Sequence, residues 1–270
     1  FTVPILTLNN ISLAYGHHLL LANVNLQVYR GERVCLVGRN GTGKSTLFRL
    51  ISGVAQPDEG EIWYRDTLRI SFLQQEVPED THSTIFDVVA AGLGKLGKLL
   101  GEYQLALNNP EHKDLHTIAE LQQGIDLLDG WNVNQKVETV LSRLNLPLDK
   151  NISECSGGIK RRVMLAQALV SDPDVLLLDE PTNHMDITAI TWLEDFLLDF
   201  QGALLFITHD RTLLQHLATR IVELDRGTLT SFPGNYEHYL TKKQQMLDAE
   251  DKANAKFDKK LAEHEVWIRQ

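Results

Sequence analysis

Short apolar runs and helically spaced apolar residues follow one another along the chain. Residues 33–37, 175–178 and 203–208 are continuous or nearly continuous apolar runs, and each predicts a buried strand. Residues 45–51 carry apolar side chains at helical spacing, which predicts a helix directly after the first run. Strands that alternate with helices are typical of an α/β protein with a mostly parallel sheet. Residues 221–231 predict an antiparallel hairpin at the edge of this sheet.

Two further helical patterns fall between residues 93 and 135, on either side of a break at Asn108-Asn109-Pro110. They predict a helical hairpin, an arm inserted at about residues 93–135 into the helical subdomain of a domain that spans residues 1–240. An ordinary, longer helical subdomain is the alternative. Residues 241–270 form a charged helical pattern, which we expect to be the start of a linker.

Composition narrows the class of protein. The 270 residues are 43% hydrophobic and 23% charged, which excludes a wholly disordered, collagen-like or coiled-coil chain. The net charge of −10 argues against binding nucleic acid by bulk electrostatics alone. No apolar run approaches the roughly 18 residues of a membrane span, so no transmembrane segment is predicted. Two cysteines, Cys35 and Cys155, offer neither a disulfide framework nor metal spacing, and we expect a reducing, cytoplasmic setting.

The segment 38–45 has the spacing of a phosphate-binding loop, a glycine followed after four residues by Gly-Lys-Ser. It lies between the first predicted strand and the helix that follows, where backbone N–H groups and the helix N-terminus can wrap a phosphate. Lys44 would supply charge to the β and γ phosphates, and Ser45 would be a ligand of Mg²⁺. The predicted ATP-binding residues here are Gly38, Asn40, Gly41, Thr42, Gly43, Lys44, Ser45 and Thr46.

Two other motifs support a nucleotide site. The run 175–178 ends in Asp179 and Glu180, and carboxylates at the end of a parallel strand lie where such sheets bind ligands. Asp179 would hold Mg²⁺ through water, and Glu180 would deprotonate the attacking water. Ser156-Gly157-Gly158 precedes a periodic helix and predicts a second anion-binding helix N-terminus.

These motifs, in this order, make the chain resemble the ATP-binding cassette ATPases, a P-loop family, over about residues 5–239. The resemblance implies roles for further residues. Tyr15 would stack on adenine, with a core tyrosine as the alternative, and Gln74, or Gln75 beside it, would reach Mg²⁺ and the attacking water. His209 would contact the γ-phosphate, unless it is a structural histidine, and Asp186 would lie in a loop that crosses a dimer interface.

The same resemblance implies that Ser156, Gly157 and Gly158 face the nucleotide of a partner cassette. Cys155 and Ile159 stand where this signature usually has leucine and glutamine, a departure that affects polar contacts at the partner's nucleotide.

Residues 182–184, Thr-Asn-His, and the turn at 232–236 are similar to the F subfamily of these ATPases. The resemblance implies ATP hydrolysis with Mg²⁺, closure of two cassettes on ATP, and action on the ribosome or on structured nucleic acid. The chain does not begin with Met and its last residues carry no helix stop, so we expect a second cassette in the same polypeptide, or a homodimer for this piece alone. A membrane transporter's ATPase subunit and a DNA-processing cassette are the rival interpretations.

Overall fold

The computed structural model describes residues 3–16, 18–73, 83–108, 115–127, 132–148, 150–183 and 185–249. Its strands are β1 (Leu6–Tyr15), β2 (His18–Val28), β3 (Arg33–Val37), β4 (Glu59–Tyr64), β5 (Ile70–Leu73), β6 (Val175–Asp179), β7 (Ala203–Ile207), β8 (Arg220–Asp225) and β9 (Thr228–Pro233). Its helices are α1 (Lys44–Ile51), α2 (Ile85–Ala91), α3 (Lys95–Asn108), α4 (Leu115–Leu127), α5 (Val133–Arg143), α6 (Gly157–Leu169), α7 (Ile187–Asp199) and α8 (Arg211–Leu217). Residues 236–249 are also helical.

The strands form two sheets. Six strands lie in the order β5-β6-β7-β3-β8-β9, and every neighbouring pair is parallel except the β8–β9 hairpin at the edge. The mostly parallel sheet and its antiparallel hairpin were predicted from the sequence, and both are confirmed. The sequence did not predict that β2, β1 and β4 form a separate antiparallel sheet. β1 and β2 follow each other as a hairpin, whereas β4 joins β1 from a segment farther along the chain, a pairing that the pattern of one strand does not encode.

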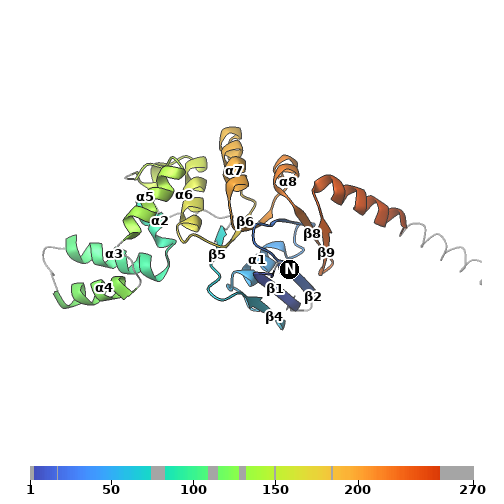
Figure 1. The fold of residues 1–270 in the computed structure, drawn as a ribbon, viewed down its shortest axis with the longest axis horizontal. Coiled ribbons are helices and arrows are strands. Elements are labelled where there is room, and N and C mark those ends of the chain that lie inside the picture. The colour runs from blue at the N-terminus through green and yellow to red at the C-terminus, as the bar shows by residue number, and fades with distance from the viewer. Residues whose placement is uncertain are drawn as a thin grey trace, which may run out of the picture.

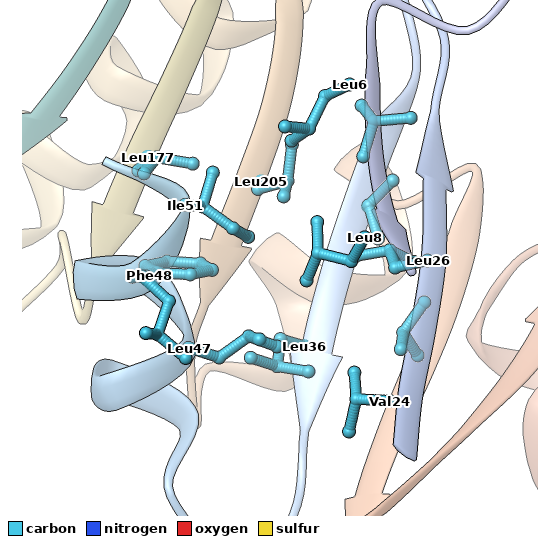
Figure 2. Packing of buried hydrophobic residues seen from close by; sticks show 14 of the residues in the cluster. Leu6, Leu8, Val24, Leu26, Leu36, Leu47, Phe48, Ile51, Leu177 and Leu205 are labelled. Atoms are coloured by element: carbon cyan, nitrogen blue, oxygen red, sulfur yellow. The ribbon is translucent and has the colours of Figure 1, made fainter. Parts of the chain in front are cut away.

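Helix α1 is buried between the two sheets (Figure 2). Leu47, Phe48 and Ile51 on α1 pack against β3, β6 and β7 on one side and against the antiparallel sheet on the other. Phe48 and Ile51 are no more than 1% exposed. This burial holds the start of α1, and with it the segment 38–44, at a defined place over the six-stranded sheet.

The opposite face of the six-stranded sheet is covered by α6, α7 and α8, whose apolar residues pack on side chains such as Leu178 and Phe206. Helices α2 and α5 pack with one side of α6 in a separate apolar cluster and form a helical lobe. Figure 1 shows this lobe at one end of the molecule, with α3 and α4 as its outermost part, and the helix after β9 at the other end. Tyr103 of α3 accepts a hydrogen bond from Gln122 of α4 at 2.9 Å, so the two helices lie against each other.

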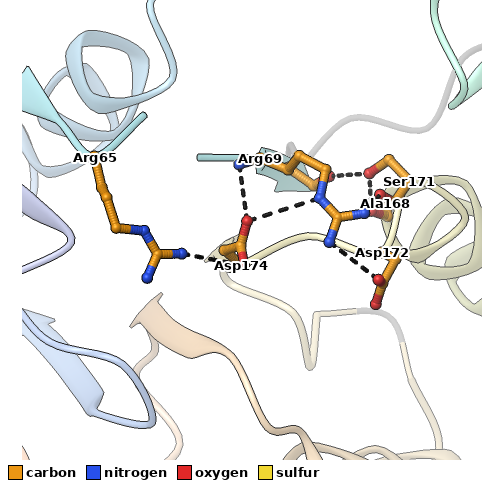
Figure 3. Close-up of polar contacts among 7 residues, drawn as sticks. Arg65, Arg69, Ala168, Ser171, Asp172 and Asp174 are labelled. Atoms are coloured by element: carbon orange, nitrogen blue, oxygen red, sulfur yellow. Dashed lines mark hydrogen bonds and ion pairs between the residues drawn. The ribbon is translucent and has the colours of Figure 1, made fainter. Parts of the chain in front are cut away.

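A polar cluster joins the starts of β5 and β6 (Figure 3). The Asp174 carboxylate accepts a hydrogen bond from the Arg69 backbone N–H at 3.1 Å and lies 3.6 Å from the Arg65 guanidinium. The Arg69 guanidinium donates to the Ser171 carbonyl at 3.0 Å and pairs with Asp172. The cluster sets the register of β5 against β6 at the edge of the sheet opposite to the carboxyl ends of the parallel strands.

Candidate functional site

The loops that follow β3, β6 and β7 surround one hollow of about 540 Å³ at the carboxyl edge of the six-stranded sheet. This is the edge where parallel α/β sheets bind their ligands. The hollow is lined by residues from the predicted phosphate loop, from the strand ends and from the antiparallel sheet: Tyr15, Leu20, Asn40, Gly41, Gly43, Lys44, Ser45, Thr46, Asp179, Glu180, Asn183, Ile207 and His209. Segments far apart in the sequence therefore meet at one site.

Gly41 and Gly43 are two of the positions at which the backbone of the phosphate loop requires glycine. Gly41 and Gly43 have φ values of 80° and 102°, in the left-handed region that residues with a Cβ rarely adopt. A Cβ on Gly43 would also lie 2.7 Å from the Leu20 side chain. Helix α1 begins at Lys44, directly after this turn, so its N-terminal N–H groups face the loop. The local geometry suits an anion such as a phosphate.

Lys44 lies inside the curve of the loop. Its Nζ donates to the carbonyl oxygens of Gly38 at 2.8 Å and Arg39 at 2.9 Å, and the residue is 8% exposed. Burial lowers the pKa of Lys44, while the carboxylates of Glu180 and Asp179 oppose this shift.

Gly38 and Thr42, which were also predicted to bind ATP, lie outside the lining of the hollow. Thr42 instead donates its hydroxyl to the Arg39 carbonyl at 2.9 Å.

Glu180 and His209 contact each other across the ends of β6 and β7. One Glu180 carboxylate oxygen lies 3.3 Å from His209 Nε2, and the other accepts a hydrogen bond from the His209 backbone N–H at 3.3 Å. Burial raises the pKa of the Glu180 carboxyl, and the contacts with His209 oppose this shift. A half-buried carboxylate of raised basicity is suited to accept a proton.

The donor set fits a magnesium ion that arrives with a nucleotide. Asp179 is 6% exposed, and both it and Ser45 line the hollow. Within the described part of the chain, no group of three or more His, Cys, Asp or Glu residues could hold a metal. Mg²⁺ in phosphate-transferring sites is held by one or two carboxylates and by the substrate's own phosphates, so a sparse donor set is what such an ion needs.

Tyr15 is a further predicted residue that lies at the hollow. Tyr15 is 60% exposed at the end of β1 and lines the hollow, so its ring is available to a flat ligand. Gln74 and Gln75 lie outside the described residues.

Leu20 and Asn183 line the hollow although the sequence did not assign them a role. Asn183 follows Asp179 and Glu180 by a few positions, a signal that could have identified it.

The signature residues are placed away from this hollow. Ser156 is the N-cap of α6 and accepts a hydrogen bond from the Ile159 N–H at 3.4 Å. None of Ser156, Gly157 and Gly158 is among the described residues that line the hollow. Asp186 caps α7, with its carboxylate accepting from the Ala189 N–H at 2.8 Å. In this chain Ser156 and Asp186 each cap a helix, at places separate from the hollow.

The chain matches a known protein family. A family model with the description ABC transporter matches residues 21–183, which include the phosphate loop, α6 and the end of β6. The chain belongs to the ATP-binding cassette family. A second model with the same description matches residues 222–270.

The cassette is similar along nearly its whole length to curated relatives. It is 48% identical to ATP-binding protein Uup of Haemophilus influenzae and 43% identical to Uup of Escherichia coli, over 99% of this chain in both comparisons. It is 36% identical to the energy-dependent translational throttle protein EttA of Mycobacterium tuberculosis, over 98% of this chain. The arm pattern and residues 265–270 also resemble the Uup branch of the F subfamily, and these identities confirm that the chain is similar to Uup proteins. The cassette spans 42% to 48% of the length of these relatives.

Solved structures agree on the fold. A nucleotide-free ATP-binding cassette from an ABC transporter superposes with a TM-score of 0.68 at 20% identity, covering 88% of this chain and 94% of that one. At this identity the similarity concerns the fold alone. None of the helices in the described part of this cassette has both the length and the apolar character to cross a membrane.

The geometry of the phosphate loop predicts the effect of Lys44→Ala. Mg-ATP should raise the melting temperature of the parent, because a ligand that binds the folded state stabilises it. The variant should lose most of this increase, since it lacks the cation that the loop encloses. Arg39→Ala is the matched control, because Arg39 is an exposed cation of the same loop whose side chain does not line the hollow. Thermal melting with and without Mg-ATP checks this, and an equal increase in Lys44→Ala would remove Lys44 from the site.

Proposed function

We propose that the chain is an ATP-hydrolysing cassette that works together with a second cassette in a longer protein. The observation that supports this most directly is the meeting of Lys44, Asp179, Glu180 and His209 around one hollow. A cation, a metal-binding carboxylate and a half-buried base are the groups that phosphoryl transfer to water needs. The cytoplasmic location expected from the sequence stays a prediction.

In the proposed reaction, the oxygen of a water molecule attacks the γ-phosphorus of ATP. Glu180 accepts one proton of that water, the bond between the γ-phosphorus and the bridging oxygen breaks, and ADP and phosphate leave.

Lys44 and the loop N–H groups hold the phosphates, and the Tyr15 ring stacks on the adenine. Asp179, through water, and Ser45 would hold Mg²⁺, with Gln74 as a further ligand, and the ion would neutralise charge on the phosphates. His209 lies beside Glu180, where it can orient the carboxylate and contact the γ-phosphate.

The signature supports a composite site. Apart from its own helix backbone and chain neighbours, a Cβ on Gly158 would meet no described atom within 4 Å, so no packing in the described part of this chain requires glycine there. The close approach of a partner's phosphate to the start of α6 would require it. We propose that Ser156, Gly157 and Gly158 face the nucleotide bound by the partner cassette, and that Asp186 lies in the loop between the two.

The relatives support the biological part of the proposal. The curated relatives are more than twice as long as this chain, which leaves room for a second cassette. EttA is named as a translational throttle protein, and this name supports action on the ribosome. We propose that closure of two cassettes on ATP acts on the ribosome, through the arm at 93–135 or the linker at 241–270.

The assignment of the base predicts the outcome of Glu180→Gln. The variant keeps the size of the side chain but cannot accept the proton, so kcat should fall by about 10²- to 10⁴-fold while ATP binding is kept. Glu138→Gln, an exposed change on α5, is the control and should match the parent. Phosphate release and ATP-induced stabilisation are the two measurements. Parent-like hydrolysis by Glu180→Gln would place the base elsewhere.

The composite site predicts that turnover depends on protein concentration. At low concentration the chain should bind ATP as a monomer and hydrolyse it slowly, and turnover per mole should rise as weak dimers form. Ser156→Arg should suppress this turnover without weakening ATP binding, because the side chain intrudes on the partner's nucleotide. Ser156→Ala separates the added bulk from the lost hydroxyl, since it loses the same helix cap, at a cost of about 1 kcal/mol, but stays small, and it should lower turnover less than Ser156→Arg does. A high rate that does not change over a wide dilution series contradicts the composite site.

The ribosome proposal is tested on the full-length, two-cassette protein that carries Glu180→Gln. We expect it to sediment with ribosomes when ATP is present and to remain in the supernatant without nucleotide, since blocked hydrolysis should keep the cassettes closed. Omission of ATP is the control for non-specific binding. Equal sedimentation with and without ATP, or copurification with a membrane protein instead, would contradict the proposal, and the second result would favour the transporter interpretation.

A further inference from the structure

One buried arginine contacts the turn that follows β6. Arg161, in the second turn of α6, is 5% exposed. Its Nη2 donates to the carbonyl oxygens of Asp179 at 3.1 Å and Glu180 at 3.3 Å, and its Nε donates to that of Pro181 at 3.4 Å. A single guanidinium therefore serves three consecutive backbone carbonyls.

The turn is unfavourable without such support. Glu180 has a φ of 47°, in the left-handed region where its Cβ crowds the backbone. Pro181 follows it, and a proline favours an extended conformation in the residue before it. Buried carbonyl groups also need donors, and the five N–H groups of a guanidinium form a rigid fork that can supply several at once. The contacts of Arg161 offset these costs at the residues that impose them.

The direction of the Glu180 side chain depends on this turn. The φ and ψ of a residue fix the direction of its Cα–Cβ bond relative to the neighbouring chain. In the observed turn, both carboxylate oxygens of Glu180 lie 3.3 Å from groups of His209 at the edge of the hollow. An extended backbone at Glu180 would point the side chain in another direction and break both contacts.

We propose that Arg161 is a positioning residue for Glu180, because its guanidinium holds residues 179–181 in the left-handed turn that directs the carboxylate into the hollow. The proposal rests on the proposed function, in which Glu180 is the base. Arg161 is not among the described residues that line the hollow, so it should affect the rate of hydrolysis and leave ATP binding unchanged.

The first test compares Arg161→Gln and Arg161→Lys with Arg162→Gln. Arg162 is the neighbour on α6, and its guanidinium lies 4.9 Å from the Trp192 ring centre instead of at the turn, which makes it a matched control. Arg161→Gln should keep KM and the ATP-induced rise in melting temperature, but its kcat should fall by about 10- to 100-fold, the scale of a misplaced reacting group. Arg161→Lys should recover part of the loss, since an ammonium keeps the charge but not the fork. Parent-like kcat in a folded Arg161→Gln overturns the proposal.

A double-mutant cycle tests whether Arg161 acts through Glu180. In the Glu180→Gln background, Arg161→Gln should lower kcat no further, because no carboxylate remains to be directed. A loss that multiplies with that of Glu180→Gln would show that Arg161 acts by another route and would overturn the proposal. If Arg161→Gln does not fold, Arg161→Lys takes its place in the same cycle. Parent-like hydrolysis by Glu180→Gln alone is the different result that contradicts the proposed function itself.

Discussion

β6, β7 and β3 run parallel and side by side, so their carboxyl ends meet at one edge of the six-stranded sheet. Asp179 is paired with Ile207, and Cys35 with Phe206, which fixes the three strand ends at nearly the same level. The phosphate loop, the Asp179-Glu180 pair and His209 follow these ends and therefore face one hollow. A shift of one strand by a single residue would reverse which side chains face the core and would move its loop out of the site.

The two faces of this sheet hold the site in different ways. On one face, α1 is buried between the sheets, and the antiparallel sheet brings Tyr15 and Leu20 to the hollow. Leu20 lies so close to Gly43 that the tertiary packing, as well as the local turn, requires glycine at that position. On the other face, α6, α7 and α8 cover β6, which ends at Asp179, and β7, which His209 follows.

Helix α6 belongs to both parts of the molecule. Met164 and Leu165 pack in the cluster on the sheet, while Val163 and Ala166 pack in the cluster of the helical lobe. Ser156 is at its start and Arg161 contacts the turn at Glu180. In the proposed composite site, one rigid helix thus connects the residue that faces a partner's nucleotide with the backbone that directs the base of this chain's own site.

The sequence by itself determined the phosphate loop, the buried strands and the Asp179-Glu180 strand end. Each of these can be identified from local spacing and residue types, because few other local structures need the same pattern. It also contained a signal for Arg161, which lies on the same helical face as Met164 and Leu165, yet a buried arginine has no identifiable partner until the chain is folded. Only the tertiary structure decided that β1, β2 and β4 form a separate sheet, that the Leu20 side chain packs against Gly43, and that Arg161 contacts residues 179–181. Except for the β1–β2 hairpin, these features come from contacts between segments that are separated along the chain, and the free energy of such contacts depends on packing and geometry that no local pattern records.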